Sequence, residues 1–389
     1  MTVSVVDEYE GIVRLIKLCS GVCGANVFVA TYKVNALTWI VVTFINLYFI
    51  FTGYTLYINI FIEKDWTHML QVICFFGSAL QGYCKLLNAI WNKDHLRYLV
   101  DDLREVYAEY APKHDEYRSC LQNSINTAVK CIKLMAFFHV AITVGLIGVV
   151  PFFRFVFNER IFVMQFQLPG IDGDTEYGYL IMNCMHSICI IFGAFGNFAA
   201  DLCFFTFVSH FPLFKGILSC KFHDLNDVLE GSDDVKKAEC KEMLKDIFRW
   251  HQKYMRYITT VKDNYFWVLL VEMATIALSI SSTLFCLLLG TWPGGQTYLS
   301  YCFIMLYIYC GLGTVVEVTN DSFTDLCYTQ VIWYKLPAAE RKMLSMMLMM
   351  AQKTGGLTIG AVIPLTVNTG LQLTKLIYTL TMMLINFLD

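Results

Sequence analysis

The sequence has little charge. Asp, Glu, Lys and Arg make up 16% of its 389 residues, against about 25% in an ordinary soluble domain. The net charge of −3 gives no basic footprint of the kind that binds DNA or RNA. Metal-ligand spacings, nucleophile motifs and phosphate-binding glycine loops are also missing, so the sequence indicates no class of enzyme. Hydrophobic residues reach 57%, more than a soluble fold can bury, and this predicts a membrane protein.

Long apolar stretches predict seven membrane-spanning helices, because a helix needs about 20 residues to cross about 30 Å of hydrocarbon. Pro293 and Gly294 mark a tight turn between the fifth and sixth spans. The fifth span contains Glu272, and a charge at that depth must be paired or solvated. The predicted spans are 34–62, 66–84, 134–153, from about 177 to past 200 with Asp201 towards its end, 264–292, 298–316 and 357–388.

The distribution of basic residues predicts the orientation of the chain. Of the 29 Lys and Arg residues, 23 fall in segments on one side of the predicted spans and three on the other. Basic short loops stay in the cytoplasm, so we expect a cytoplasmic N-terminus and an extracellular C-terminus, the inverse of a G-protein-coupled receptor. None of the 15 Cys residues lies in a predicted outer loop, so no extracellular disulfide is expected. No cleavable signal peptide is recognisable, and the first span is expected to act as an uncleaved anchor.

We therefore predict an all-α membrane protein with four regions. Apolar residues at helical spacing, such as Leu244, Ile247 and Tyr254, predict cytoplasmic helices that continue into spans. Pro337 begins another helix, which Gly355 and Gly356 end. The regions are 1–33 (cytoplasmic), 34–316 (spans one to six with cytoplasmic helical loops at 91–130 and 211–263), 317–356 (cytoplasmic anchor helices) and 357–389 (seventh helix).

The C-terminal 60 or so residues carry the strongest motif. They resemble the C-terminal signature of the insect odorant receptor family, which consists of seven-helix olfactory channel subunits. The matching positions are Trp333, Tyr334, Pro337, Arg341, Lys342, Ala351, Gln352, Leu357, Thr358, Gly360, Pro364, Leu365, Thr369, Lys375, Tyr378 and Asn386-Phe387-Leu388. The coreceptor that this family shares has a large insertion between spans four and five, whereas the loop here has about 50 residues. The chain thus resembles a variable, odorant-tuning subunit.

The resemblance implies a ligand-gated, non-selective cation channel in the plasma membrane of a sensory neuron dendrite. It implies a heterotetramer with the coreceptor, a pore lined by the seventh helix, and a pocket for a small volatile odorant among spans two, three, four and six. Permeating cations and membrane lipid would be its other partners, and no cofactor is implied. The implied pocket residues are Phe75, Phe76, His139, Thr143, Leu146, Met182, Met185, His186, Ile190, Tyr298, Tyr301 and Met305.

The seventh helix has two candidate pore faces. One carries Ile377, Thr381, Leu384 and Leu388, and apolar rings of this kind can gate by dewetting; the alternative is that its leucines face lipid. The other is a polar stripe that either lines a wet vestibule or bonds to neighbouring helices. It comprises Asn368, Gln372, Lys375 and Thr379.

Three other functions fit a seven-span chain. A gustatory-type channel would usually end in a Thr-Tyr-x5-Gln-Phe pattern, which this C-terminus does not match. A G-protein-coupled receptor would have the opposite orientation. A secondary transporter often contains an internal repeat, and none is recognisable here.

Overall fold

The computed structural model describes residues 4–230, 236–292, 294–353 and 355–386, and most of them lie in α-helices. The side chains of 236–238 and 384–386 are outside this description. The elements are α1 (Val5–Val22), α2 (Ala36–Tyr57), the π-helical turn η1 (Ile58–Glu63), α3 (Trp66–Trp91), α4 (Lys93–Tyr110), α5 (Asp115–Val156), α6 (Glu176–Ser209), α7 (Phe211–Glu230), α8 (Lys236–Leu288), α9 (Gly295–Thr329), the 3₁₀ turn η2 (Trp333–Lys335), α10 (Ala338–Gln352), β1 (Thr358–Ile359), β2 (Ile363–Pro364) and α11 (Val367–Asn386).

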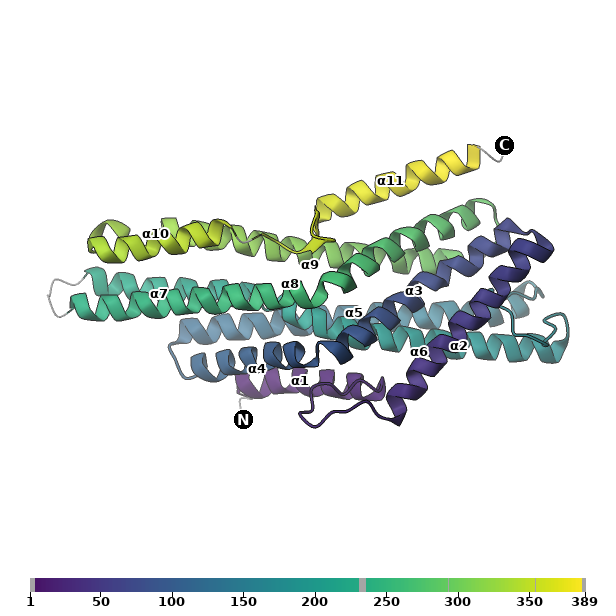
Figure 1. The fold of residues 1–389 in the computed structure, drawn as a ribbon, viewed down its shortest axis with the longest axis horizontal. Coiled ribbons are helices and arrows are strands. Elements are labelled where there is room, and N and C mark those ends of the chain that lie inside the picture. Colours follow the sequence, from purple (N-terminus) through teal and green to yellow (C-terminus); the bar gives the residue numbers. More distant parts are fainter. Residues whose placement is uncertain (1–3, 231–235, 293, 354, 387–389) are drawn as a thin grey trace.

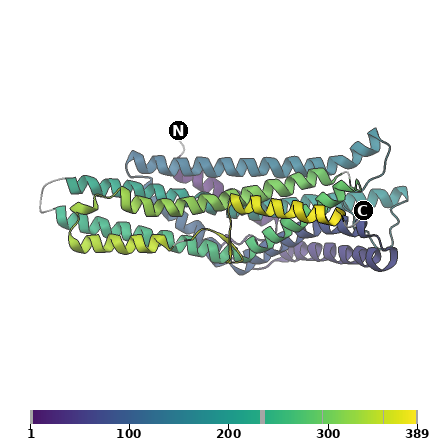
Figure 2. The ribbon, with the colours of Figure 1, turned by 90° about the horizontal axis from the view of Figure 1, so that it is seen from above.

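The helices form one elongated bundle (Figure 1). Helix α10 lies toward one end of the long axis and α11 toward the other, and both views show this separation (Figure 2). The longest helices, α5 and α8, are 42 and 53 residues long. At 1.5 Å per residue both exceed the thickness of a bilayer. They therefore continue from the membrane into the end that the charge distribution places in the cytoplasm.

Six helical segments in the described part of the chain are long and apolar enough to cross a membrane. They are 36–63, 66–91, 115–156, 176–230, 239–288 and 295–329, and each contains or overlaps one of the first six predicted spans. Helix α11 is the seventh. With 20 residues it is long enough to cross, but Asn368, Gln372 and Lys375 make it less apolar than the others. A spanning helix with polar residues needs protein or water beside them.

The predicted start of the seventh span is wrong by about ten residues. Residues 358–364 form a short antiparallel hairpin, in which Thr358 pairs with Pro364 and Ile359 with Ile363. Gly360 and Ala361 have positive φ, which reverses the chain. Helix α11 begins only after this hairpin, at Val367.

Side chains that cap the helices explain several of their starts. Asn35 and Thr38 form a capping box at the start of α2. The carboxylate of Asp65 accepts hydrogen bonds from two backbone amides at the start of α3, and the Thr175 hydroxyl accepts one at the start of α6. Each cap satisfies amides that would otherwise be unpaired at a membrane boundary.

The cytoplasmic half has a tightly packed aromatic core. The ring of Phe214 in α7 stacks on Trp250 in α8 with centroids 5.3 Å apart, and the Trp250 indole donates to the Phe214 carbonyl at 3.0 Å. Tyr254 stacks on Phe323 of α9 at 4.0 Å. Leu244, Ile247 and Tyr254, which the sequence placed at helical spacing, are buried, and so is Tyr257. This core holds α7, α8 and α9 together below the membrane.

Candidate functional site

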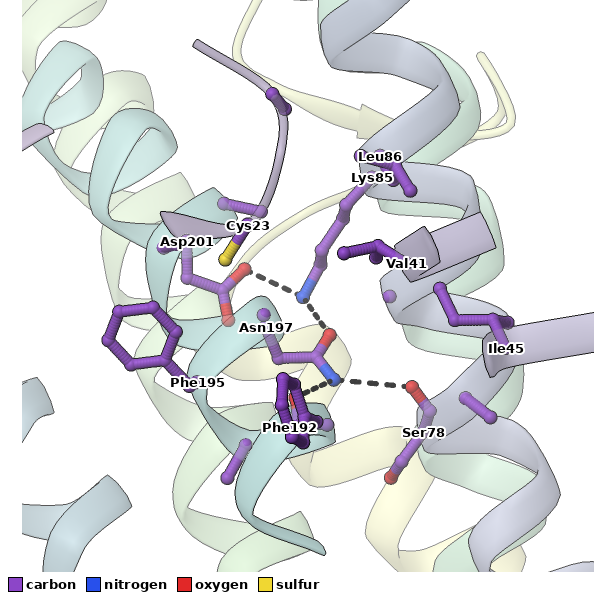
Figure 3. A pocket seen from close by; sticks show the side chains of 18 of the residues that line it. Cys23, Val41, Ile45, Ser78, Lys85, Leu86, Phe192, Phe195, Asn197 and Asp201 are labelled. Carbon is purple, nitrogen blue, oxygen red and sulfur yellow. Dashed lines mark hydrogen bonds and ion pairs between the residues drawn. The ribbon is translucent and has the colours of Figure 1, made fainter. Parts of the chain in front are cut away.

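A cavity of about 400 Å³ lies among the membrane helices α2, α3, α5, α6 and α9, with contributions from Tyr265 and Val268 of α8 and from the end of α1 and the α1–α2 segment. This volume is within the usual range of small-molecule sites. Apolar side chains supply most of its wall, for example Val41 and Ile45 of α2 and Phe195 of α6 (Figure 3), and Ile142 of α5.

Helical periodicity explains which residues of α3 reach the cavity. On α3 the lining positions are 75, 78, 79, 82, 85, 86, 88 and 89, whereas on α6 nearly every position from 189 to 204 lines it. Steps of three and four residues keep a set on one face of a helix. Gly82 and Gly193 are among the lining residues, and their lack of side chains leaves room in the cavity.

The structure brings seven of the twelve predicted pocket residues to this cavity. The rings of Phe75 and Tyr298 pack in a tilted arrangement with centroids 4.3 Å apart, and the Tyr301 hydroxyl lies 3.5 Å from Nε2 of His139. The seven are Phe75, His139, Thr143, Leu146, Ile190, Tyr298 and Tyr301.

The other five predicted residues lie outside it. Phe76 is turned by one position from Phe75 and packs on Phe49 of α2 at 5.3 Å. Nε2 of His186 is 3.0 Å from the Phe166 carbonyl, so this ring fixes the outer loop instead. Met182 and Met305 are buried elsewhere in the core, and Met185 packs against its edge. Their proximity in sequence to lining residues did not put them on the lining face.

A buried charge cluster at the cavity was not predicted. Nζ of Lys85 lies 2.7 Å from Asp201 and 2.9 Å from Glu272, and it donates to Asn197 at 3.3 Å. The three charged residues are at most 5% exposed. Lys85, Asn197 and Asp201 line the cavity (Figure 3).

Electrostatics explain why these charges occur together. An isolated charge in a low-dielectric interior is strongly destabilising, and a partner of opposite sign offsets that cost. Lys85 of α3 is the partner that the sequence analysis required for Glu272. The two carboxylates that it pairs with come from α6 and α8. Two carboxylates face one ammonium, so the fully ionised cluster has a net charge of −1. Tyr309 of α9 also donates its hydroxyl to Asp201.

The charges were visible in the sequence, but their pairing was not. Lys85 directly follows the second predicted span, Asp201 lies towards the end of the fourth, and Glu272 lies within the fifth. Charges at the edges of spans are ordinarily solvated by the interface. The packing of α3 against α6 and α8 in the fold brings all three together.

Two of the four residues of the predicted apolar gate on α11 are buried within the chain. Ile377 and Thr381 are 2% and 1% exposed within a single chain. They therefore pack inside the bundle of their own chain, where α11 contacts α8 and α9. Leu384 has no described side chain and Leu388 lies outside the described residues. The predicted polar stripe behaves oppositely, because Asn368, Gln372, Lys375 and Thr379 are all exposed.

Comparison with known proteins agrees with this architecture. The family model described as 7tm Odorant receptor matches residues 65–378. Putative odorant receptor 83c of Drosophila melanogaster is 25% identical, over 98% of each chain, and odorant receptor 85b of the same species is 22% identical over 89% of this chain and 90% of its own. The solved structure of the olfactory receptor OR5 from Machilis hrabei in complex with eugenol has the same fold. Its TM-score is 0.76 at 16% identity, over 98% of this chain and all of that one.

These matches favour an odorant receptor over the gustatory, G-protein-coupled and transporter alternatives, and the family is one of receptors rather than enzymes. The family model covers well over half of the chain and includes α3, α5, α6 and α9, which form much of the cavity. The chain is an all-α, multi-pass membrane protein and belongs to the 7tm odorant receptor family.

Proposed function

We propose that this chain is the odorant-binding, tuning subunit of a ligand-gated, non-selective cation channel that it forms with the family's coreceptor in the plasma membrane of sensory neurons. A small volatile binds in the cavity among α2, α3, α5, α6 and α9. The observation that supports this most is the cavity itself, which is apolar, about 400 Å³ in volume and within the spanning part of the bundle. The relative from Machilis hrabei was solved with the small aromatic molecule eugenol.

Helix α9 connects the cavity to α11. Its outer part contributes Tyr298 and Tyr301 to the cavity wall. Further along, the Tyr307 hydroxyl is 3.1 Å from that of Thr374 in α11, and the Thr314 hydroxyl accepts from the Val367 amide at 3.0 Å. A ligand that displaces the tyrosines would therefore move a helix that directly holds α11. We propose this as the route from binding to opening.

The pore lies along the exposed face of α11 in this proposal. Asn368, Gln372, Lys375 and Thr379 on that face would hydrate permeating ions. This replaces the face of Ile377, which is buried in its own chain.

Exposed apolar side chains at the cytoplasmic end support assembly with other subunits. Trp333, Tyr334, Met346 and Met349 are each more than 40% exposed, although they lie outside the membrane helices. Such patches in water mark protein interfaces. We propose that the coreceptor covers them.

The function is tested by expressing the chain alone and with the coreceptor and recording currents evoked by a panel of volatile odorants. Odorant-evoked current on co-expression alone is expected. Current from the chain alone would contradict the tuning-subunit proposal, and silence in a pair shown to reach the surface would contradict the odorant-gated channel.

Tyr301→Ala tests whether the cavity is the odorant site. Loss of its ring from the wall should raise the half-maximal odorant concentration by roughly tenfold or more, with currents to a coreceptor agonist unchanged. Met305→Ala, on the same helix but outside the cavity, is the matched control. An unchanged odorant response in Tyr301→Ala would place the binding site elsewhere.

A further inference from the structure

The charge cluster leaves the cavity with a hydrogen-bond acceptor that nothing satisfies. Within the described part of the chain, Oδ2 of Asp201 has no hydrogen-bond partner, although the residue is 1% exposed. Its other oxygen, Oδ1, contacts Lys85 at 2.7 Å and accepts from Tyr309. Asp201 lines the cavity, and Figure 3 shows its second oxygen turned away from the ammonium. A buried carboxylate oxygen without a donor is costly.

The donors around Asp201 are already used by the protein. The three N–H groups of Lys85 face Asp201, Glu272 and Asn197. The Asn197 amide donates both its hydrogens, to the carbonyls of Ser78 at 3.2 Å and Gly193 at 3.0 Å. The single hydroxyl hydrogen of Tyr309 goes to Asp201. A ligand group that reaches the Asp201 carboxylate can therefore donate a hydrogen bond to it, whereas Lys85, Asn197 and Tyr309 have no hydrogen left for a ligand to accept.

The hydroxyls of Tyr298, Ser78 and Thr143 in the cavity wall also have their hydrogens engaged by the protein. The Tyr298 hydroxyl donates to the Cys74 carbonyl at 2.9 Å, and the Ser78 hydroxyl lies 2.7 Å from the Tyr298 oxygen, to which it donates. Thr143 donates to the His139 carbonyl at 2.6 Å. These hydroxyls too keep lone pairs, not hydrogens, for a ligand.

We propose that the cavity selects ligands with an apolar body and one hydrogen-bond donor, a hydroxyl or a primary amine, which binds Oδ2 of Asp201. The proposal rests on the function proposed above and adds the ligand class. Ketones, esters and ethers of the same shape are disfavoured, because their oxygens would face the Asp201 carboxylate without a shared hydrogen. An ammonium group would also compensate the net charge of −1 on the ionised cluster.

The first test compares ligands that differ only at the polar end, in cells that express the full chain with the coreceptor. Two series are used: octanol, octylamine, methyl octyl ether and octane, and phenylethanol, phenylethylamine, methyl phenylethyl ether and ethylbenzene. A hydrogen bond to a buried carboxylate should make the alcohol or amine effective at a concentration about tenfold or more below that of its ether. An advantage of the amine alone supports recognition by charge, and one shared with the alcohol supports recognition by hydrogen bonding.

Two outcomes overturn the inference while the proposed function survives. One is equal potency of ether and alcohol in both series. The other is a response to panel odorants without a donor, with all alcohols and amines silent. Silence toward every odorant would instead be a failure of the proposed function.

Two variants with the same change in charge test the residue itself. Asp201→Asn places an amide where Oδ2 lies, so the preference for alcohol over ether should fall by about tenfold or more. Glu272→Gln removes the same charge from the cluster, but Glu272 is not a lining residue in the described part of the cavity, and the preference should persist. An unchanged preference in Asp201→Asn, or an equal loss in both variants, would overturn the assignment to Asp201. Surface labelling confirms that each variant reaches the membrane. If a variant does not reach it, the ligand series measured on the unmodified receptor tests the proposal instead.

Discussion

At the scale of single residues, Lys85 has the largest predicted effect on stability. It is the shared cation of Asp201 and Glu272, so Lys85→Met would leave two buried carboxylates without a counter-charge. Breaking a buried ion pair in this way costs about 3–5 kcal/mol. We expect a clear fall in the unfolding temperature of the detergent-solubilised receptor, measured by size-exclusion chromatography after heating.

The control and the rescue follow from the same contacts. Lys130→Met changes an exposed position of α5 and should leave the unfolding temperature nearly unchanged. Adding Glu272→Gln to Lys85→Met removes one uncompensated charge and should restore part of the loss. A Lys85→Met receptor as stable as the unmodified one would show that the cluster is not ionised as proposed.

His210 predicts how stability depends on pH. It lies at the α6–α7 junction on the cytoplasmic side, where burial lowers its pKa from 6.5 to about 4. The ring is 2.6 Å from the Thr206 carbonyl and 3.1 Å from the Tyr107 hydroxyl, so neutral imidazole donates to the first and accepts from the second.

The unfolded chain takes up a proton on His210 below about pH 6.5, whereas the folded one does so only near pH 4. Its contribution is therefore complete above pH 6.5 and falls as the pH drops toward 4, by about 3 kcal/mol in all. Unfolding temperatures measured across this range should show the slope. His210→Phe should flatten it and His95→Phe, at an exposed position, should not; a slope unaltered by His210→Phe would contradict the assignment.

At the scale of elements, a close approach between α9 and the β2–α11 connection positions α11. A Cβ on Gly313 would lie 1.9 Å from the Leu365 carbonyl oxygen, so the two backbones touch where only glycine fits. Gly313→Ala should push the connection away from α9 and weaken the link from cavity to pore. We expect an overpacking cost of about 1–3 kcal/mol and a reduced maximal odorant current.

Gly311→Ala is the matched control, because a Cβ there meets nothing within 4 Å. Both glycines are interior to α9, so any effect on helix propensity is shared. Equal effects of the two substitutions on current and on unfolding temperature would argue against the contact with Leu365.

The elements were predictable to different degrees. The first six spans and the cytoplasmic helices follow from long apolar runs and helical spacing, signals that are local in the sequence. The start of α11 was missed because Leu357, Thr358 and Ile359 are as apolar as a span, while the reversal at Gly360 and Ala361 depends on backbone φ. The face of α11 was also not predictable. Ile377 lies on the buried side of α11 and Gln372 on the exposed side. Which side is buried depends on packing against α8 and α9, which are distant from α11 in the sequence.

The site shows the same division between local and distant information. Phe75, Tyr298 and Tyr301 could be proposed as pocket residues because each lies in a predicted span of the implied region. The link between Lys85 and Asp201 joins α3 to α6 across more than a hundred residues of sequence, and no periodicity reports such a contact. Charged residues in membrane helices therefore predicted that ion-pair partners exist, but the sequence did not identify which residues those partners are.

At the scale of the whole molecule, the two faces of α11 decide how chains can surround a pore. In a closed ring of subunits each chain presents an equivalent surface to the central axis. Within one chain Thr379 is exposed and Thr381 is 1% exposed, with its hydroxyl bonded to the Ile377 carbonyl at 2.9 Å. The two positions carry the same residue type, which makes them a matched pair.

Cysteine substitution at these two threonines tests which face lines the pore of the assembled channel. In receptors co-expressed with the coreceptor and opened by odorant, a positively charged methanethiosulfonate reagent applied from outside should reduce the current of Thr379→Cys. The reaction should be roughly tenfold or more faster than for Thr381→Cys, because a thiol reacts as the thiolate and needs contact with water. The unmodified receptor, with its 15 cysteines, gives the background rate. Faster modification of Thr381→Cys would instead indicate that the face of Ile377 and Thr381 lines the pore. That result would require α11 to rotate when the subunits assemble.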